Sequence, residues 1–175
     1  MANLEELDMV QIILNLLEDK FKSTFKSYVY GVPEEKPQSL APFIMVGQPG
    51  ISEIVLGCTG SDLITEDIVI MVIVNKKNDF GNRNSGAYSL KTIKDLVIGY
   101  ARNATSNRIE IDTNTILGYL RQQLNLVNSE GQARVYGAMT GSVSFDGETD
   151  KAGTIWEFAQ INLKYQRKAG VLSRT

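Results

Sequence analysis

Apolar residues recur at spacings of three and four along the first 28 positions, the period of a helix with one buried face. Asn3 followed by Glu6 forms a capping-box pattern, so a helix is predicted to start at Asn3 and to extend as far as Ser27. The apolar stripe predicts packing against the core, and a ligand for a partner's groove is the alternative. The stripe consists of Leu4, Leu7, Val10, Ile13, Leu14, Leu17, Phe21, Phe25 and Tyr28.

Short apolar runs after residue 40 predict strands. Residues 43–46 and 53–56 are typical of two short strands, separated by a type II turn at Pro49-Gly50. The segment 63–75 contains seven consecutive apolar residues, mostly β-branched. A strand that is apolar on both faces is expected at the centre of a sheet and covered on both sides.

Helical spacing returns twice in the middle of the chain. Residues 87–102 predict a helix that covers one face of the sheet, after an exposed loop at 76–86. Residues 113–123 predict a shorter helix with Asp112 or Thr113 as its cap.

Alternating residues near the C-terminus predict a long β-hairpin. Its first strand is expected at 133–145, and 146–153 is expected to form the loop to the second strand. Thirteen residues in a strand span on the order of 40 Å, whereas the usual strand has five or six residues. Such an arm is predicted to extend beyond its own sheet and pair with a neighbouring subunit.

Five apolar residues of the second strand do not share one parity. A β-bulge near Ala159-Gln160 would bring all five to the same buried face, and we therefore expect a bulge there. The five residues are Trp156, Phe158, Ile161, Leu163 and Tyr165.

These elements predict one α+β domain over residues 1–175. Its mixed, mostly antiparallel sheet is expected to be packed by the N-terminal helix and one or two further helices, and to end in the long C-terminal β-hairpin. With 175 residues, 43% of them hydrophobic and 22% charged, the chain has the size and composition of an ordinary soluble domain.

Composition removes most catalytic and metal sites. The chain has no histidine and one cysteine, Cys58, which excludes Ser-His-Asp and Cys-His arrangements and a structural zinc site. No phosphate-binding glycine motif follows a predicted strand. The sequence therefore predicts no catalytic residues, no cofactor site and no metal site.

One acidic pattern imitates a calcium loop. Asp146, Glu148, Asp150 and Glu157 occupy the first, third, fifth and twelfth positions of that register. Lys151 stands where a glycine should make the sharp turn, and the flanking segments are predicted strands rather than helices. We interpret the segment as a solvated hairpin tip.

Charge is distributed unevenly between the two ends. Residues 1–20 carry five acids and one base, and residues 160–175 carry four bases and no acid, although the net charge is only −2. A surface that coats nucleic acid would be basic, so the net charge argues against coating nucleic acid as the main task, and passive proximity to DNA stays open. Opposite signs suit head-to-tail packing of identical copies, and two solvated faces are the alternative. The expected contact residues are Lys164, Arg167, Lys168, Glu5 and Glu6.

The chain shows no pattern for export or for membrane insertion. Its first residues lack a basic segment followed by an apolar run, and its longest apolar stretch is far shorter than the ~20 residues of a membrane span. The expected location is the cytosol or a particle assembled there.

The segment Thr154 to Tyr165 resembles the closing strand of bacteriophage neck or tail terminator proteins. That strand often carries a Trp-Glu unit, here Trp156-Glu157, with an alanine shortly after it and then an alternating pattern. The order of parts upstream is also similar, including a proline-bearing link into the first strand at Pro42. Where the family often has arginine before the alanine, this chain has Phe158.

The resemblance implies a non-enzymatic virion protein of the phage neck or tail, present in the host cytoplasm during assembly. It implies a ring of copies, commonly a hexamer, that caps the tail tube, ends its polymerisation and joins the tail to the head connector or adaptor protein. DNA would cross the lumen without sequence-specific contact, and no membrane partner is implied. The alternatives are a head-completion or connector-adaptor protein and, from another class, a small cytosolic ligand-binding domain or enzyme with a closed polar pocket.

Overall fold

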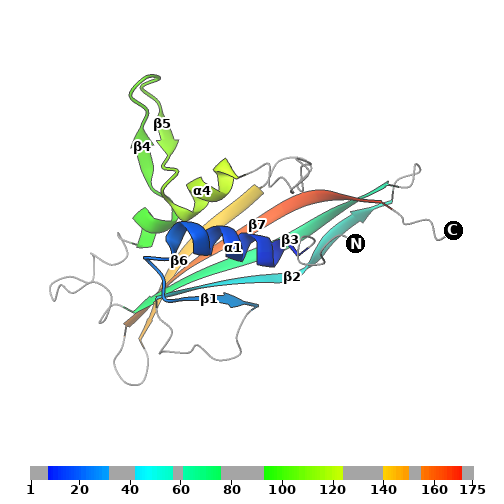
Figure 1. Cartoon of the computed structure of the whole chain (residues 1–175), viewed down its shortest axis with the longest axis horizontal. Coiled ribbons are helices and arrows are strands. Elements are labelled where there is room, and N and C mark those ends of the chain that lie inside the picture. Colours follow the sequence, from blue (N-terminus) through cyan, green and yellow to red (C-terminus); the bar gives the residue numbers. More distant parts are fainter. Residues whose placement is uncertain are drawn as a thin grey trace.

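The computed structural model describes residues 8–31, 42–56, 61–75, 93–123, 140–149 and 155–170. In chain order the elements are α1 (Met9–Phe21), β1 (Ser27–Tyr30), β2 (Phe43–Val55), β3 (Ser61–Asn75), β4 (Tyr100–Arg102), β5 (Ile109–Ile111), α4 (Ile116–Gln122), β6 (Thr140–Thr149) and β7 (Ile155–Gly170). Residues 93–97 are also helical. The fold is α+β, with a mixed and mostly antiparallel sheet, an N-terminal helix and a C-terminal β6–β7 hairpin, as predicted (Figure 1).

Five strands form the main sheet in the order β1-β2-β3-β7-β6. β1 runs parallel to β2, and every other neighbouring pair is antiparallel. β3 lies at the centre, as its apolar run predicts, and β7 pairs with it without interruption from Ser61↔Gly170 to Asn75↔Trp156. β4 and β5 form a separate two-stranded sheet.

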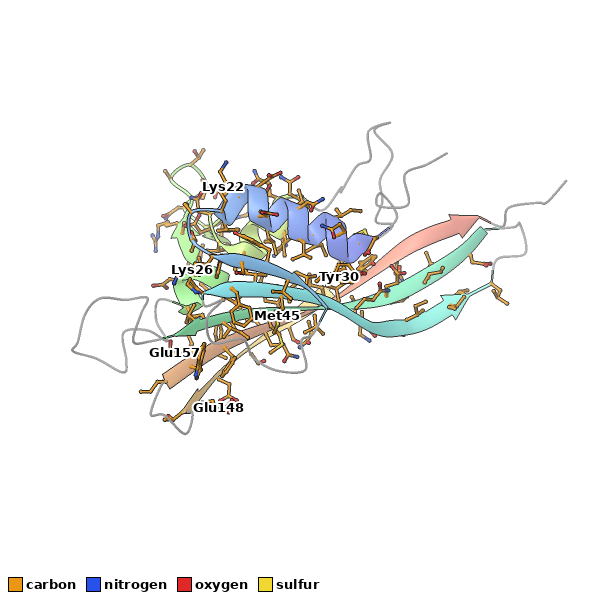
Figure 2. The ribbon with its side chains drawn as sticks, turned by 60° about the horizontal axis from the view of Figure 1, so that its bottom comes forward. Lys22, Lys26, Tyr30, Met45, Glu148 and Glu157 are labelled. Carbon is orange, nitrogen blue, oxygen red and sulfur yellow. The ribbon has the colours of Figure 1, made fainter. Side chains whose placement is uncertain are left out.

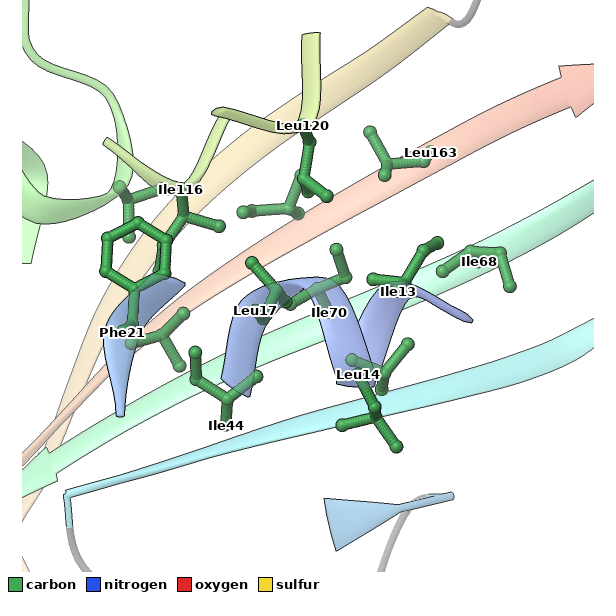
Figure 3. Close-up of a cluster of buried hydrophobic side chains, with 14 of the residues drawn as sticks. Ile13, Leu14, Leu17, Phe21, Ile44, Ile68, Ile70, Ile116, Leu120 and Leu163 are labelled. Atoms are coloured by element: carbon green, nitrogen blue, oxygen red, sulfur yellow. The ribbon is translucent and has the colours of Figure 1, made fainter. Parts of the chain in front are cut away.

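The main core lies between the sheet and helix α1 (Figure 3). The buried stripe of α1 packs over alternate residues of β2, β3 and β7, and α4 closes the cluster on one side. The residues labelled in this cluster are Ile13, Leu14, Leu17, Phe21, Ile44, Ile68, Ile70, Ile116, Leu120 and Leu163.

Helix α1 is shorter than the predicted helix. Asp8 has an extended backbone, and its carboxylate accepts hydrogen bonds from the amides of Val10 (2.9 Å) and Gln11 (3.3 Å), so Asp8 is the N-cap. The predicted start at Asn3 lies outside the described residues. A helix that is continuous from Asn3 is nevertheless wrong, because the extended backbone of Asp8 interrupts it. The predicted end at Ser27 is also wrong, because Ser27–Tyr30 forms β1. Its aromatic and β-branched residues suit a strand, and pairing with β2 outweighs the helical spacing of Tyr28.

A second apolar cluster lies on the face of the sheet that points away from α1. It contains Phe43, Met45, Ile73, Trp156 and Phe158, which are all buried. The predicted bulge near Ala159-Gln160 is absent, because the register of β7 with both neighbours runs through this segment without a shift.

The prediction that five residues of β7 share one face is therefore wrong. Trp156 and Phe158 lie on the face away from α1, whereas Ile161, Leu163 and Tyr165 lie on the α1 face, and all five side chains are buried. Both faces of the sheet are buried along this part of β7, so a strand with apolar residues of both parities needs no bulge.

The two short strands predicted at 43–46 and 53–56 are parts of one strand, β2. The type II turn at Pro49-Gly50 is wrong, because the backbone of Gly50 does not have the positive φ that such a turn needs. The register with β3 shifts between Gly47 and Gly50 instead. A bulge accommodates a proline within a strand, since the residue there need not donate to the ladder.

The two middle helices end or begin elsewhere than predicted. The described helical turn covers 93–97, and the chain enters β4 at Tyr100, so a helix reaching residue 102 is wrong. α4 begins at Ile116 and its N-cap is Thr115, not Asp112 or Thr113; the Thr115 hydroxyl accepts from the amide of Gly118 at 3.1 Å. The Thr115 hydroxyl also donates a hydrogen bond to the backbone carbonyl oxygen of Asp112, at 2.6 Å.

The first strand of the C-terminal hairpin also differs from its predicted bounds. β6 is described from Thr140, and 133–139 lies outside the described residues. The strand continues to Thr149, opposite Ile155, so the predicted loop at 146–153 is wrong at its start. Cross-strand pairing with β7 extends the strand beyond the apolar alternation that ends at Phe145.

Tyr28 supplies a test of the packing in β1. Its hydroxyl oxygen is buried without a hydrogen-bond partner, and burial, with the nearby Glu18 carboxylate, raises the pKa of Tyr28 to about 12. An unfolded tyrosine ionises near its ordinary pKa of 10.0, so the unfolded state loses this proton first, and the stability that is present below pH 10 falls as the pH rises from 10 to 12.

Tyr28→Phe is therefore expected to leave stability at pH 8 unchanged or higher and to reduce the loss of stability between pH 10 and 12. Urea unfolding of both proteins across this range measures the difference. Parallel pH profiles for wild type and variant would contradict the burial of this phenol.

Candidate assembly surface

The strands of the main sheet are much longer than the helix that covers them. β3 has 15 residues and β7 has 16, so each spans about 50 Å, whereas the 13 residues of α1 span about 20 Å. Figure 2 shows β2, β3 and β7 continuing past the end of α1 opposite Lys22. We call residues 50–55, 61–67 and 164–170 the sheet extension. This part of the sheet cannot be covered by α1.

A buried polar pair lies at the root of the sheet extension. Glu66 and Tyr165 are direct cross-strand partners on the α1 face, only 2% and 1% exposed, and the Tyr165 hydroxyl donates a hydrogen bond to the Glu66 carboxylate. A buried carboxylate is costly unless it is hydrogen-bonded. The pair therefore fixes the register where the sheet leaves the body. The sequence alternation gives no sign that Glu66 is buried.

The outer end of β2 carries the densest group of exposed apolar side chains. Ile51, Ile54, Val55 and Leu56 are 51%, 54%, 49% and 76% exposed. These four are half of the eight large hydrophobic residues that are exposed among the described residues. By the register with β3, Ile51 and Ile54 lie on the α1 face of β2 and Val55 on the other face, so this end of the strand exposes apolar side chains on both faces. Exposed apolar surface of this kind marks interaction surfaces.

The β2 edge of the sheet extension has no second strand partner in the described part of the chain. β1 pairs with residues 43–46 of β2, and among the described residues β2 beyond Gly50 pairs with β3 alone. The described pairing of β6 with β7 begins at Thr140↔Lys164, and the residues before Thr140 lie outside the described part of the chain. Unpaired edge strands offer amide and carbonyl groups to a strand from another chain.

The predicted contact residues are only partly brought together. Lys164 is exposed, and its Nζ forms an ion pair with Oδ1 of Asp67 in its own chain, at 3.5 Å. Arg167 and Lys168 occupy positions of β7 opposite Ile64 and Leu63. Their backbone therefore belongs to the sheet extension together with that of Lys164. Glu5 and Glu6 lie outside the described residues.

A second exposed element was missed by the sequence analysis. β4 and β5 form an arm that rises from the body, away from the main sheet (Figure 1). Tyr100 and Ile109 lie on one face of this arm and are 66% and 70% exposed. The polar run between them, residues 103–108, is the signal that indicates a hairpin turn.

The arm is held at its tip and at its base. At the tip, the side-chain oxygen of Asn103 accepts hydrogen bonds from the backbone amides of Thr105 (2.9 Å) and Ser106 (3.0 Å). At the base, a Cβ on Gly118 would lie 2.0 Å from the carbonyl oxygen of Asp112, so only glycine permits this contact between α4 and the arm.

The acidic residues of the calcium-like pattern do not converge. Asp146 and Glu148 are exposed on β6, on the sheet face away from α1, and Glu157 is buried on the α1 face. Asp150 lies outside the described residues. A depression of about 230 Å³ borders the exposed pair; it is lined by Met71, Ser144, Asp146, Glu148, Phe158 and Gln160.

Within the described residues, no group of three acidic, histidine or cysteine side chains is placed to hold a metal ion. No helix in the same part of the chain is long and apolar enough to cross a membrane. The chain matches no protein-family model and no curated protein sequence.

Proposed function

We propose that the protein is a non-enzymatic structural protein that assembles head to tail into a ring, and that the ring is a bacteriophage tail terminator. The observation that carries the proposal is the sheet extension, which continues beyond α1 and has exposed apolar residues on β2, the strand whose outer edge has no second partner among the described residues. Edges and apolar side chains of this kind favour contact with another polypeptide.

The resemblance of Thr154 to Tyr165 to the closing strand of tail terminators supports the particular identity. Phe158, which replaces the arginine that is frequent in the family, is 8% exposed and belongs to the apolar cluster away from α1. If the family's arginine contributes to a ring interface, another basic residue must take that role in this chain. Lys164, Arg167 and Lys168 supply three bases on the strand that contains this segment.

A contact between two different surfaces of identical copies is heterologous, so it must close into a ring or continue indefinitely. Closure would fix the number of copies in the ring. A closed ring that binds the last ring of the tail tube on one face, and binds no further tube subunits on the other, would end tube growth. DNA would then cross the lumen of the ring towards the tail tube.

The proposal is tested by the size of the purified protein. Light scattering and negative-stain electron microscopy should show a ring, formed alone or on tail tubes, and its stability should vary with salt because charges orient the contact. The triple change to glutamate at Lys164, Arg167 and Lys168 should weaken the ring. Exposed ion pairs contribute little energy each, so we expect weaker association rather than complete loss.

A matched control carries the same change of charge elsewhere. Lys20, Lys22 and Lys26 are exposed near the end of α1 and after it, far from the sheet extension, and their triple change to glutamate should leave the ring intact. A protein that stays monomeric at high concentration and does not bind tail tubes would contradict the proposal. Binding to heads but not to tails would instead identify a head-completion or adaptor protein.

A further inference from the structure

The depression on the sheet face away from α1 combines an apolar floor with acidic side chains at its rim. Phe158 is buried and Met71 half-buried, so they form the floor, whereas Asp146 and Glu148 are both exposed beside them. None of the described residues that line the depression is basic. An alkyl chain that ends in a cation fits such a place, because the chain can lie on the apolar floor while the cation stays beside the carboxylates. The depression therefore suits a lysine side chain from another polypeptide.

We propose that this depression receives Lys164 of a second copy. Lys164 is six residues from Phe158 on a strand with continuous register, so it also lies on the face away from α1. Its side chain is 59% exposed, and its ion pair with Asp67 is a single contact at the surface, which contributes little energy. Lys164 can therefore exchange this carboxylate for those of a neighbouring copy at small cost.

The contact cannot form within one chain. Asp146 and Glu148 pair with Phe158 and Trp156, which are six and eight residues from Lys164 along β7. At ~3.3 Å per residue these separations are about 20 Å and 26 Å. The acidic and the basic group are thus different parts of one sheet, and each copy can offer Lys164 to one neighbour and receive a lysine from another. A contact between two different surfaces is heterologous, as a ring requires.

Position favours Lys164 over exposed lysines elsewhere in the described chain. β7 carries both lysines of the described strands, Lys164 and Lys168, at positions on the face away from α1. Lys20 belongs to α1 itself, and Nζ of Lys94 lies 5.5 Å from the ring centre of Phe145, which packs on the α1 side. No acid follows Lys164 in β7. This end of β7 is therefore basic and complements the acidic depression.

Charge reversal in the full chain tests the contact. The pair Asp146→Lys with Glu148→Lys, and separately Lys164→Glu, should each raise the concentration needed for assembly about 10- to 100-fold, because like charges then meet. The protein with all three changes should recover assembly, since the charges are again opposite. Glu18→Lys with Asp19→Lys is the matched control, because both acids are exposed on α1 and their reversal should leave assembly unchanged.

A zero-length cross-link identifies the two residues directly. A carbodiimide joins a lysine amine to a carboxylate without a spacer. Mass spectrometry of the covalent dimer should show a peptide that joins Lys164 to Asp146 or Glu148, and this peptide reports a contact between copies because the separation within one chain is too large. The amide between Lys164 and Asp67 of the same chain, which are 3.5 Å apart, is the internal reference.

The inference rests on the self-association proposed above, and the two can fail separately. A ring that survives reversal of Asp146 and Glu148 and shows no such peptide would overturn this contact and leave the ring standing. A peptide with Lys168 in place of Lys164 would overturn the choice of donor. The expected peptide from a closed dimer, without a ring, would support the contact and overturn the ring. A protein that stays monomeric and does not bind tail tubes would overturn both. Circular dichroism of each variant confirms that it is folded.

Discussion

Replacing Trp156 by alanine is expected to lower the free energy of unfolding by about 3–5 kcal/mol, as removal of a core aromatic side chain does. Trp156 is 4% exposed and belongs to the cluster on the face of the sheet away from α1. A cost of this size is a large part of the stability of an ordinary domain. Urea unfolding followed by circular dichroism is the measurement, because Trp156 is the chain's only tryptophan.

The neighbouring residue supplies the control for this prediction. Ile155 is 39% exposed, so Ile155→Ala should cost far less than Trp156→Ala. The combination of Trp156→Ala with Ile161→Ala tests the two faces, because these residues belong to different clusters and their costs should add within about 0.5 kcal/mol. A small cost for Trp156→Ala, or strong coupling to Ile161, would contradict the packing of β7.

Periodicity predicted the parts of the fold in which one pattern has one structural solution. The seven consecutive apolar residues of β3 can all be buried only in a strand that is covered on both faces. This predicts a central strand, and β3 is central in the sheet. The stripe of α1 likewise contains the residues that pack on the sheet, including Leu14 and Leu17. In both cases the local pattern and the tertiary packing agree.

The sequence failed where tertiary pairing decided between alternatives. Tyr28 has helical spacing and strand propensity at once, and parallel pairing with β2 selects the strand. Pro49-Gly50 is typical of a turn, yet β3 continues alongside, and a bulge keeps both residues in β2. In β7, alternation cannot tell that both faces are covered, so a bulge was predicted near Ala159 without need.

The contact residues expected from the sequence, Lys164, Arg167 and Lys168, lie on β7 in the sheet extension, and their part in a contact stays a prediction. In the described residues, the part of the sheet left uncovered is built from β2, β3 and β7, and its exposed apolar residues are on β2. Periodicity assigns a side chain to one face of a strand but does not show what covers that face, so the exposure of Ile54 could not be foreseen.

The length of the sheet explains why buried and exposed apolar residues occur on the same strands. Near Ile70 the sheet is covered by α1, and its rows are buried. Beyond Glu66 the same strands continue without that cover, and Ile54 is exposed although its pattern is that of a core residue. The pair of Glu66 and Tyr165 marks the change, because among the described side chains it is the last row of β3 and β7 in which both residues on the α1 face are buried.

Removing the hydroxyl of Tyr165 is therefore expected to affect both stability and assembly. Tyr165→Phe keeps the ring in place but removes its hydrogen bond to the buried Glu66 carboxylate, which should cost about 1.5–3 kcal/mol. Glu66→Gln keeps an acceptor but changes the charge of the pair. If the two groups act together, the double variant should cost less than the sum of the single changes, with a coupling energy of about 0.5–3 kcal/mol.

Tyr28→Phe is the matched control, because it removes a tyrosine hydroxyl that has no hydrogen-bond partner and should cost nothing. Urea unfolding of the four proteins of the cycle gives the coupling energy, and light scattering of the same samples reports on the ring. Because the pair fixes the register at the root of the sheet extension, Tyr165→Phe should also weaken association, whereas Tyr28→Phe should not. If Tyr165→Phe costs no more than Tyr28→Phe and leaves the ring unchanged, the hydrogen bond does not position the extension.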